Sequence, residues 1–293
     1  MLARFSNGLG FDQHDLKPDV RGIALKIFGV SDASTSAQKR EPQALDLLMT
    51  NSTNPFGKDQ EEFVQFMEAS VDPGLLGFHL IGFLIAHTEV AKLLMKATLR
   101  IVPSLLTEQY WSGHTYLLGP HQAMKINVRP IEESRIAIDD ELRKETFRFQ
   151  AATLSGSNLE DQVKGWFDMQ MVANSKINPN YLSVELRDRL QRGPIRFVLS
   201  VQLEKDALTT PIEDSLVEWT ESDSPSIPVA ELVLDREIEA DICTNLRFTP
   251  GHYVPDHRPL GNIGRGRIFT YEASQVGRNA SADEPTERML LQT

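Results

Sequence analysis

The sequence predicts an α+β fold built on an antiparallel sheet. About six segments have the composition of strands, several others have the periodicity of helices, and neighbouring strands are joined by short, hairpin-like links. A chain of 293 residues can bury one large core or two ordinary ones. Short links favour antiparallel pairing, but periodicity alone leaves a barrel and a sandwich as open alternatives.

In the first hundred residues, 2–6 is expected to be extended, and two segments are expected to be strands: 22–29 and 44–50. The second strand runs into the turn sequence 51–55. Helices are expected over 58–69, whose apolar residues share one face, and over 89–102, where Pro103 stops the helix.

An apolar run over 74–86 lies between these helices. At thirteen residues it is too short to span a bilayer, which takes about 20. The run is better explained as a buried helix or element junction than as an interfacial membrane contact. A minor alternative gives it a role in admitting lipid hydroperoxides, through Phe78 and Phe83.

The second half predicts four more strands: 110–118, 123–129, 195–203 and 228–234. In the second of them Met124, Ile126 and Val128 fall on one side, and residues 119–122 suit a hairpin. Helices are expected over 139–153, 181–191 and about 261–275. Residues 156–178 resist assignment, and the polar segment 280–293 is expected to be a disordered tail.

Composition and charge narrow the class of protein. The chain is 41% hydrophobic and 24% charged, as in soluble globular proteins. A net charge of −11 argues against a nucleic-acid-binding surface. The single Cys243 excludes an internal disulfide and is consistent with a reducing, cytoplasmic location. The first residues lack the pattern of a signal peptide.

One short stretch near the C-terminus combines residues suited to iron chemistry. Arg267 and Tyr271 are four apart, so on a helix their side chains share one face. A guanidinium beside a phenol favours the phenolate, and tyrosine is an axial ligand of haem, for which catalase is the general example. Arg278 follows about two turns further on and could reach a haem propionate.

The wider string around this stretch resembles the haem-ligand segment of the haem catalase superfamily, most closely its small catalase-related branch. The similar string is Phe248-Thr-Pro-Gly-His-Tyr-Val-Pro-Asp-His-Arg-Pro-Leu-Gly-Asn-Ile263, followed by Gly266-Arg-Ile-Phe-Thr-Tyr271. Four earlier stretches agree in order: 4–8, 18–26, 47–51 and 211–219. The resemblance covers most of 3–279 and is weakest over 133–180, where an insertion is expected.

The resemblance implies an antiparallel β-barrel with surrounding helices and a buried haem b. It assigns Tyr271 as the iron ligand, Arg267 as its charge partner, and Arg4 and Arg278 as partners of the propionates. It places a peroxide-binding asparagine at Asn51, although the following proline leaves Asn54 as the alternative. Arg21 is expected to be structural, in an ion pair with Asp19 or another carboxylate.

The sequence departs from the family at its start. The family's distal histidine lies upstream of Arg-Phe-Ser in a His-Ala-Lys/Arg-Gly string, and this chain begins at Met1, two residues before Ala3. Three explanations stay open: a misassigned start, a degenerate homologue without catalase activity, or replacement by another group such as His14. A positioned acid–base group is worth on the order of 10²–10⁴ in rate, so impaired turnover is expected.

Two functions follow from the resemblance. The first is a haem-dependent catalase or peroxidase that acts on hydrogen peroxide or organic hydroperoxides. The alternative is a non-catalytic haem-binding or interaction protein. Either would be one domain over 1–279, and the resemblance implies a homo-oligomer.

Overall fold

The computed structural model describes ten stretches of the chain: 1–8, 12–17, 19–30, 43–54, 57–71, 76–98, 102–131, 140–153, 175–238 and 246–277. Arg278 and the expected tail over 280–293 lie outside them. So does most of the segment 156–178.

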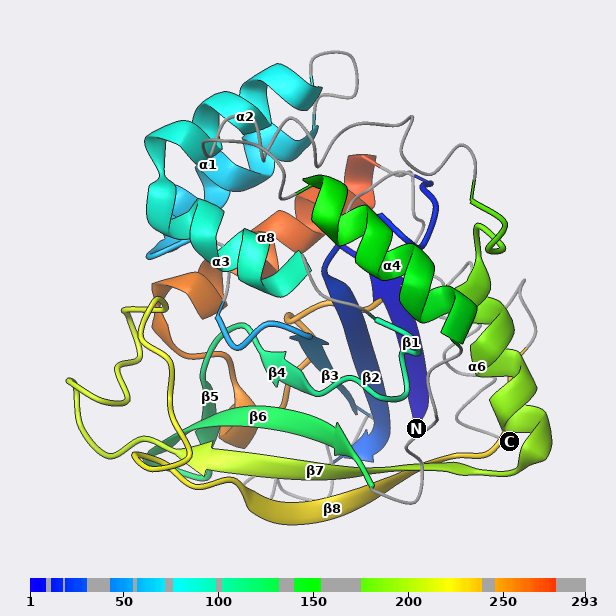
Figure 1. Cartoon of the computed structure of the whole chain (residues 1–293). Helices are drawn as coiled ribbons and strands as arrows, with labels where there is room; N and C mark the ends of the chain where they lie inside the picture. Colours follow the sequence, from blue (N-terminus) through cyan, green and yellow to red (C-terminus); the bar gives the residue numbers. More distant parts are fainter. Residues whose placement is uncertain are drawn as a thin grey trace.

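Eight strands form one antiparallel sheet that curls into half of a barrel (Figure 1). The strands are β1 (Leu2–Asn7), β2 (Arg21–Val30), β3 (Gln43–Thr50), β4 (Tyr110–Ser112), β5 (Tyr116–Leu118), β6 (Gln122–Pro130), β7 (Ile195–Leu203) and β8 (Ile227–Leu234). Their order is β1-β2-β3-β4-β6-β7-β8, with β5 also paired to β6. The expected α+β class with an antiparallel, barrel-like sheet is confirmed.

Six α-helices of the described residues surround the sheet (Figure 1). They are α1 (Gln60–Val71), α2 (Leu76–Ala86), α3 (Thr88–Thr98), α4 (Asp140–Thr153), α6 (Tyr181–Arg192) and α8 (Gly261–Gly277). Helices α1 to α3 pack together, and α1 also contacts α8. Within the described residues, no helix has the length and apolarity needed to cross a bilayer.

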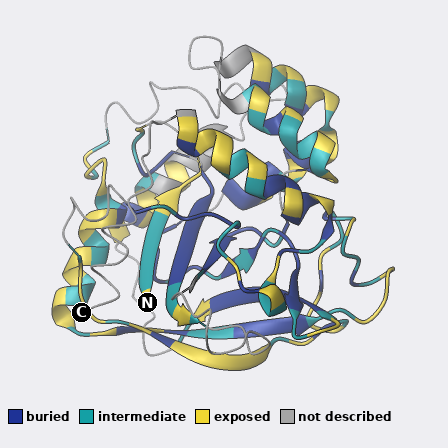
Figure 2. Cartoon of the chain, turned by 180° about the vertical axis from the view of Figure 1, so that it is seen from behind, coloured by how far each residue is buried: buried dark blue, intermediate teal, exposed yellow. Residues whose placement is uncertain are grey.

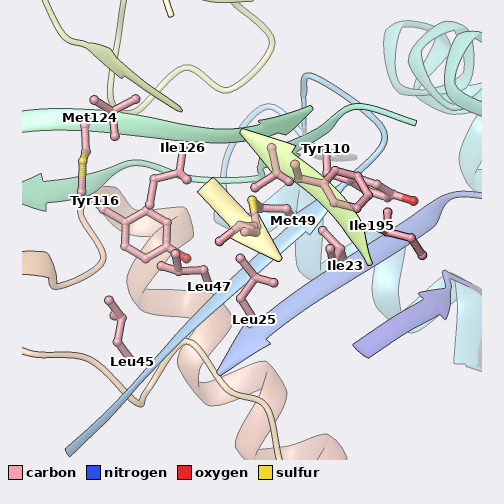
Figure 3. Packing of buried hydrophobic residues seen from close by; sticks show 14 of the residues in the cluster. Ile23, Leu25, Leu45, Leu47, Met49, Tyr110, Tyr116, Met124, Ile126 and Ile195 are labelled. Carbon is pink, nitrogen blue, oxygen red and sulfur yellow. The ribbon is translucent and has the colours of Figure 1, made fainter. Parts of the chain in front are cut away.

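The concave side of the sheet holds the main hydrophobic core (Figure 3). Met124, Ile126 and Val128 of β6 point into it, as their alternation predicts. Strands β2 and β3 are buried on both faces, because Ile23 and Met49 enter this core while neighbouring side chains pack outward against α8 and residues 246–248. Figure 2 shows β2 and β3 largely dark blue, β1 teal, and both β8 and the outer faces of the helices mostly yellow. The outward face of β2 and β3 is therefore an interior surface too.

The single strand expected over 110–118 is wrong. The structure divides it into β4 and β5, with residues 113–115 between them. The free edge of β5 is taken by a later segment: Leu117 N–H donates to the Arg258 carbonyl, and Tyr116 forms a bridge with Pro259. The chain changes direction after β4, and β5 then pairs with this later segment. The alternation of residues within 110–118 does not predict that pairing.

Helix α2 is also more exposed than the sequence predicts. Leu80 and Leu84 are buried, whereas Ile85 is 45% exposed. Phe83 lies against the Phe66 ring and stacks on His87, with ring centroids 4.2 Å apart in the latter pair. The helix therefore buries one stripe rather than its whole surface. The side chain of Phe78 lies outside the described part of the chain.

Candidate functional site

Helix α8 presents Arg267 and Tyr271 together, one turn apart. The Nη2 atom of Arg267 lies 3.5 Å from the Tyr271 hydroxyl, and its Cζ lies 5.7 Å from the centre of the ring. Arg267 is buried and Tyr271 is half-buried. The structure therefore places a guanidinium beside the phenol, as the spacing of four predicts.

A third side chain, His114, completes this arrangement from the segment between β4 and β5. Its Nδ1 atom lies 3.0 Å from Arg267 Nη1, and its ring is buried. A guanidinium only donates, so Nδ1 must accept and the ring proton must sit on Nε2. Burial lowers the pKa of His114 well below its ordinary value, and the charges of Arg267 and Lys125 add to that effect. His114 is therefore a neutral imidazole at neutral pH.

The neutral ring matters because it holds Arg267 without cancelling its charge. Among the described residues, no carboxylate lies within salt-bridge distance of Arg267. Arg21 differs: it is buried 3.9 Å from Asp19, which confirms its expected structural ion pair. The guanidinium of Arg267 therefore stands beside the Tyr271 hydroxyl, and no carboxylate of the described residues compensates its charge.

Local backbone features bring α8 close to His114. Gly261 begins the helix at φ 73°, a conformation that favours glycine, and the next residue, Asn262, donates its N–H to Glu213 Oε2. Gly264 faces His114, where a Cβ would stand 3.2 Å from its Cδ2 atom. A side chain at this position would push the helix away from the imidazole.

Sequence reasoning missed His114, because it treated residues 110–118 as one strand. The available signal was Gly113-His114-Thr115, a glycine followed by two polar residues in the middle of the expected strand. Such a glycine often marks a close backbone approach or a break in a strand.

Arg4 lies on the outward face of β1, opposite Ala24 of β2. Its Cζ atom stands 4.4 Å from the centre of the Phe248 ring. Phe248 belongs to the cluster with Ala24 and Leu48 on which Tyr271 packs. The structure thus brings Arg4 and Tyr271 to the same region, between the outward face of the sheet and α8.

The segment that carries Phe248 is fixed to β3 by buried charges. The Lys26 ammonium lies 2.9 Å from both carboxylate oxygens of Asp46, and both side chains are fully buried. Asp46 Oδ2 also accepts from the Thr249 N–H at 3.0 Å and lies 2.9 Å from His252 Nδ1. His252 therefore helps to fix this loop to β3.

Asn51 lies apart from the Arg267 group. Its Oδ1 accepts the N–H of Arg21 at 2.9 Å, and its Nδ2 donates to Glu108 Oε2 at 2.8 Å. Asn54, the alternative counterpart, donates to the Ser215 carbonyl at 2.8 Å. Both amides are buried and hydrogen-bonded, so the choice between them stays open.

Comparison with solved structures places this arrangement in a known fold. A fungal catalase matches with a TM-score of 0.66 and 18% identity over 96% of this chain. Catalase A from Saccharomyces cerevisiae matches with a TM-score of 0.65 and 19% identity over 93%. A bacterial catalase matches with a TM-score of 0.66 and 18% identity, also over 93%.

The fold is that of a catalase. The chain spans about half the length of these catalases, covering 52%, 52% and 49% of them. No protein-family model matches the sequence, and no curated protein matches it either. The comparisons therefore establish the catalase fold alone.

The residues of this catalase-like fold suit a haem by their chemistry. Tyr271 offers a hard phenolic oxygen, and the Arg267 guanidinium stands beside it. Arg4 supplies a guanidinium on the same side of the sheet, a group that binds carboxylates through two parallel hydrogen bonds. A phenolic oxygen and two guanidinium groups are thus present within one region.

Proposed function

We propose that this chain is a haem b protein that acts on hydrogen peroxide or organic hydroperoxides. The observation that carries the proposal is the contact between Arg267, Tyr271 and the neutral ring of His114. Arg4 and Arg278 would bind the two propionates. The functional unit would be one domain over 1–279 and would assemble as a homo-oligomer.

The role of each residue follows from its surroundings. Tyr271 would ligate the iron as a phenolate, because Arg267 compensates the negative charge. His114 would hold Arg267 in place and leave its charge intact. Bound haem would supply the iron centre at which a peroxide O–O bond is cleaved. Arg267 and His114 would set the charge around the Tyr271 oxygen that would hold the iron.

Asn51 would hydrogen-bond the peroxide. After its bond to Glu108, one N–H of the amide is left to donate. Because Arg21 and Glu108 fix the amide, a peroxide would meet a preorganised donor.

The same bonds favour a second candidate: a haem-binding protein without turnover. Asn51 joins β2 to Glu108 in a buried network, which is a structural role in itself. In that case Tyr271 and Arg267 would still bind haem, but Asn51 would not bind peroxide.

Peroxide consumption by hemin-reconstituted protein separates the two candidates. The enzyme predicts turnover of hydrogen peroxide or an organic hydroperoxide above that of free hemin, lost in Tyr271→Phe and kept in Tyr253→Phe. Tyr253 is 38% exposed and serves as the matched control. A specific haem spectrum without turnover would support the second candidate and refute the enzyme.

A further inference from the structure

Four polar side chains form a compact patch on the outward faces of β6 and β7. Lys125 and Asn127 alternate with the core residues of β6. They pair in register with Gln202 and Ser200 of β7, respectively. The four therefore stand as two adjacent cross-strand pairs on one face. Each is at most 7% exposed.

The segment over 219–226 covers this patch. Gln202 donates to the carbonyls of Trp219 and Ser224, at 2.9 and 2.7 Å. Asn127 Nδ2 donates to the Ser226 hydroxyl at 2.9 Å. The indole of Trp219 lies over Lys125, with Nζ 5.0 Å from the ring centre. These contacts enclose the polar groups under a fixed cover.

Three atoms of the patch have no hydrogen-bond partner. They are the Lys125 ammonium, the Asn127 Oδ1 atom and the Ser200 hydroxyl. Within the described stretches, no carboxylate stands within salt-bridge distance of Lys125 either. Buried polar groups in folded proteins are nearly always paired, and buried charges more strictly so. Three neighbouring exceptions on one face indicate a common missing partner.

The chemistry of the three atoms specifies that partner. The ammonium has three N–H donors, the hydroxyl can donate once, and the amide oxygen can only accept. The partner must therefore have a negatively charged oxygen that accepts hydrogen bonds and a hydroxyl that donates one. It must be small, because Asn127 and Ser200 face each other across one strand spacing and Lys125 lies only two residues away along β6.

We propose that this patch binds a small protonated oxyanion, with bicarbonate as the best match. Its charged oxygens accept from Lys125 and Ser200, and its hydroxyl donates to Asn127. Formate and nitrate match the charge but leave the Asn127 oxygen unpaired. The indole of Trp219 closes the remaining side of the ammonium. The four residues of the patch are not among the proposed haem residues, although Lys125 lies near enough to His114 for its charge to act on that ring. The test needs no haem.

Thermal unfolding of the purified full chain without haem tests this site. Sodium bicarbonate is compared with sodium formate and sodium chloride at matched pH and ionic strength. A ligand that binds only the folded state raises the unfolding midpoint. The expected order of midpoints is bicarbonate above formate above chloride. In Lys125→Met the bicarbonate-specific rise disappears, and in Lys92→Met, whose lysine is 67% exposed beside Glu89, it persists.

Ser200→Ala provides a second variant if Lys125→Met unfolds. It removes one donor and should weaken the bicarbonate response several-fold. Equal midpoints in bicarbonate and chloride would overturn the proposal, since water would then fill the patch. An equal bicarbonate response in wild type, Lys125→Met and Ser200→Ala would overturn it as well. A formate response as large as that of bicarbonate would refute the assignment of a protonated ligand.

Discussion

Replacing Asp46 by Asn tests how the fold holds the outward face of the sheet. The ion pair between Lys26 and Asp46 is fully buried, with distances of 2.9 Å to both oxygens. Asn keeps the shape of the side chain, so the substitution removes charge without opening a cavity. Removing the carboxylate partner of a buried ammonium lowers the free energy of unfolding by about 3–5 kcal/mol. The side-chain amide would also turn an N–H donor toward that ammonium or toward the Thr249 N–H.

The assay is urea unfolding of the full chain, followed by circular dichroism. We expect Asp46→Asn to lower the free energy of unfolding by about 3–5 kcal/mol, a large part of the roughly 5–15 kcal/mol typical of a domain. The double variant Lys26→Met with Asp46→Leu should recover most of the loss, because it leaves no buried charge.

Glu89→Gln is the matched control. Its partner Lys92 and Glu89 itself are each 67% exposed, so this ion pair should contribute less than about 1 kcal/mol. A loss below about 1 kcal/mol in Asp46→Asn would refute the reasoning. So would a double variant as unstable as Asp46→Asn alone.

Two further predictions concern pH. Burial lowers the pKa of Lys125 from 10.5 to about 8, so between these values the unfolded chain binds the extra proton and stability rises with pH. The free energy of unfolding is measured with urea at each pH in bicarbonate-free buffer. Between pH 8 and 10.5, that of wild type should rise by roughly 3 kcal/mol relative to that of Lys125→Met. A difference between the two proteins that does not change with pH would contradict this. Burial also lowers the pKa of His114, so its stabilising contribution is present above pH 6.5 and is lost as pH falls. His114→Gln should show a flatter acid limb than wild type in the same assay, and parallel acid limbs would count against the neutral imidazole.

Much of the fold could be predicted because its signals are local. The alternation of Met124, Ile126 and Val128 gave the core face of β6 directly. The spacing of Arg267 and Tyr271 gave their common face of α8 for the same reason. In both cases the periodicity of one element decides the geometry.

What sequence reasoning missed depends on contacts between distant parts of the chain. His114 meets Arg267 across 153 residues, and the segment over 256–260 takes the edge of β5. The partners of Lys26 include His252, 226 residues away. The unsatisfied patch around Lys125 emerges only when β6 and β7 are aligned in register. Neither spacing nor composition encodes these pairings.

The central claim is that Tyr271, supported by Arg267, is the ligand of a haem iron. The most direct measurement is the absorption spectrum of the protein reconstituted with hemin, beside Tyr271→Phe and the control Tyr253→Phe. The account predicts a Soret band with a high-spin ferric tyrosinate signature in wild type and in Tyr253→Phe, lost or shifted in Tyr271→Phe. The same spectrum in all three proteins, or no specific Soret band in wild type, would contradict the claim.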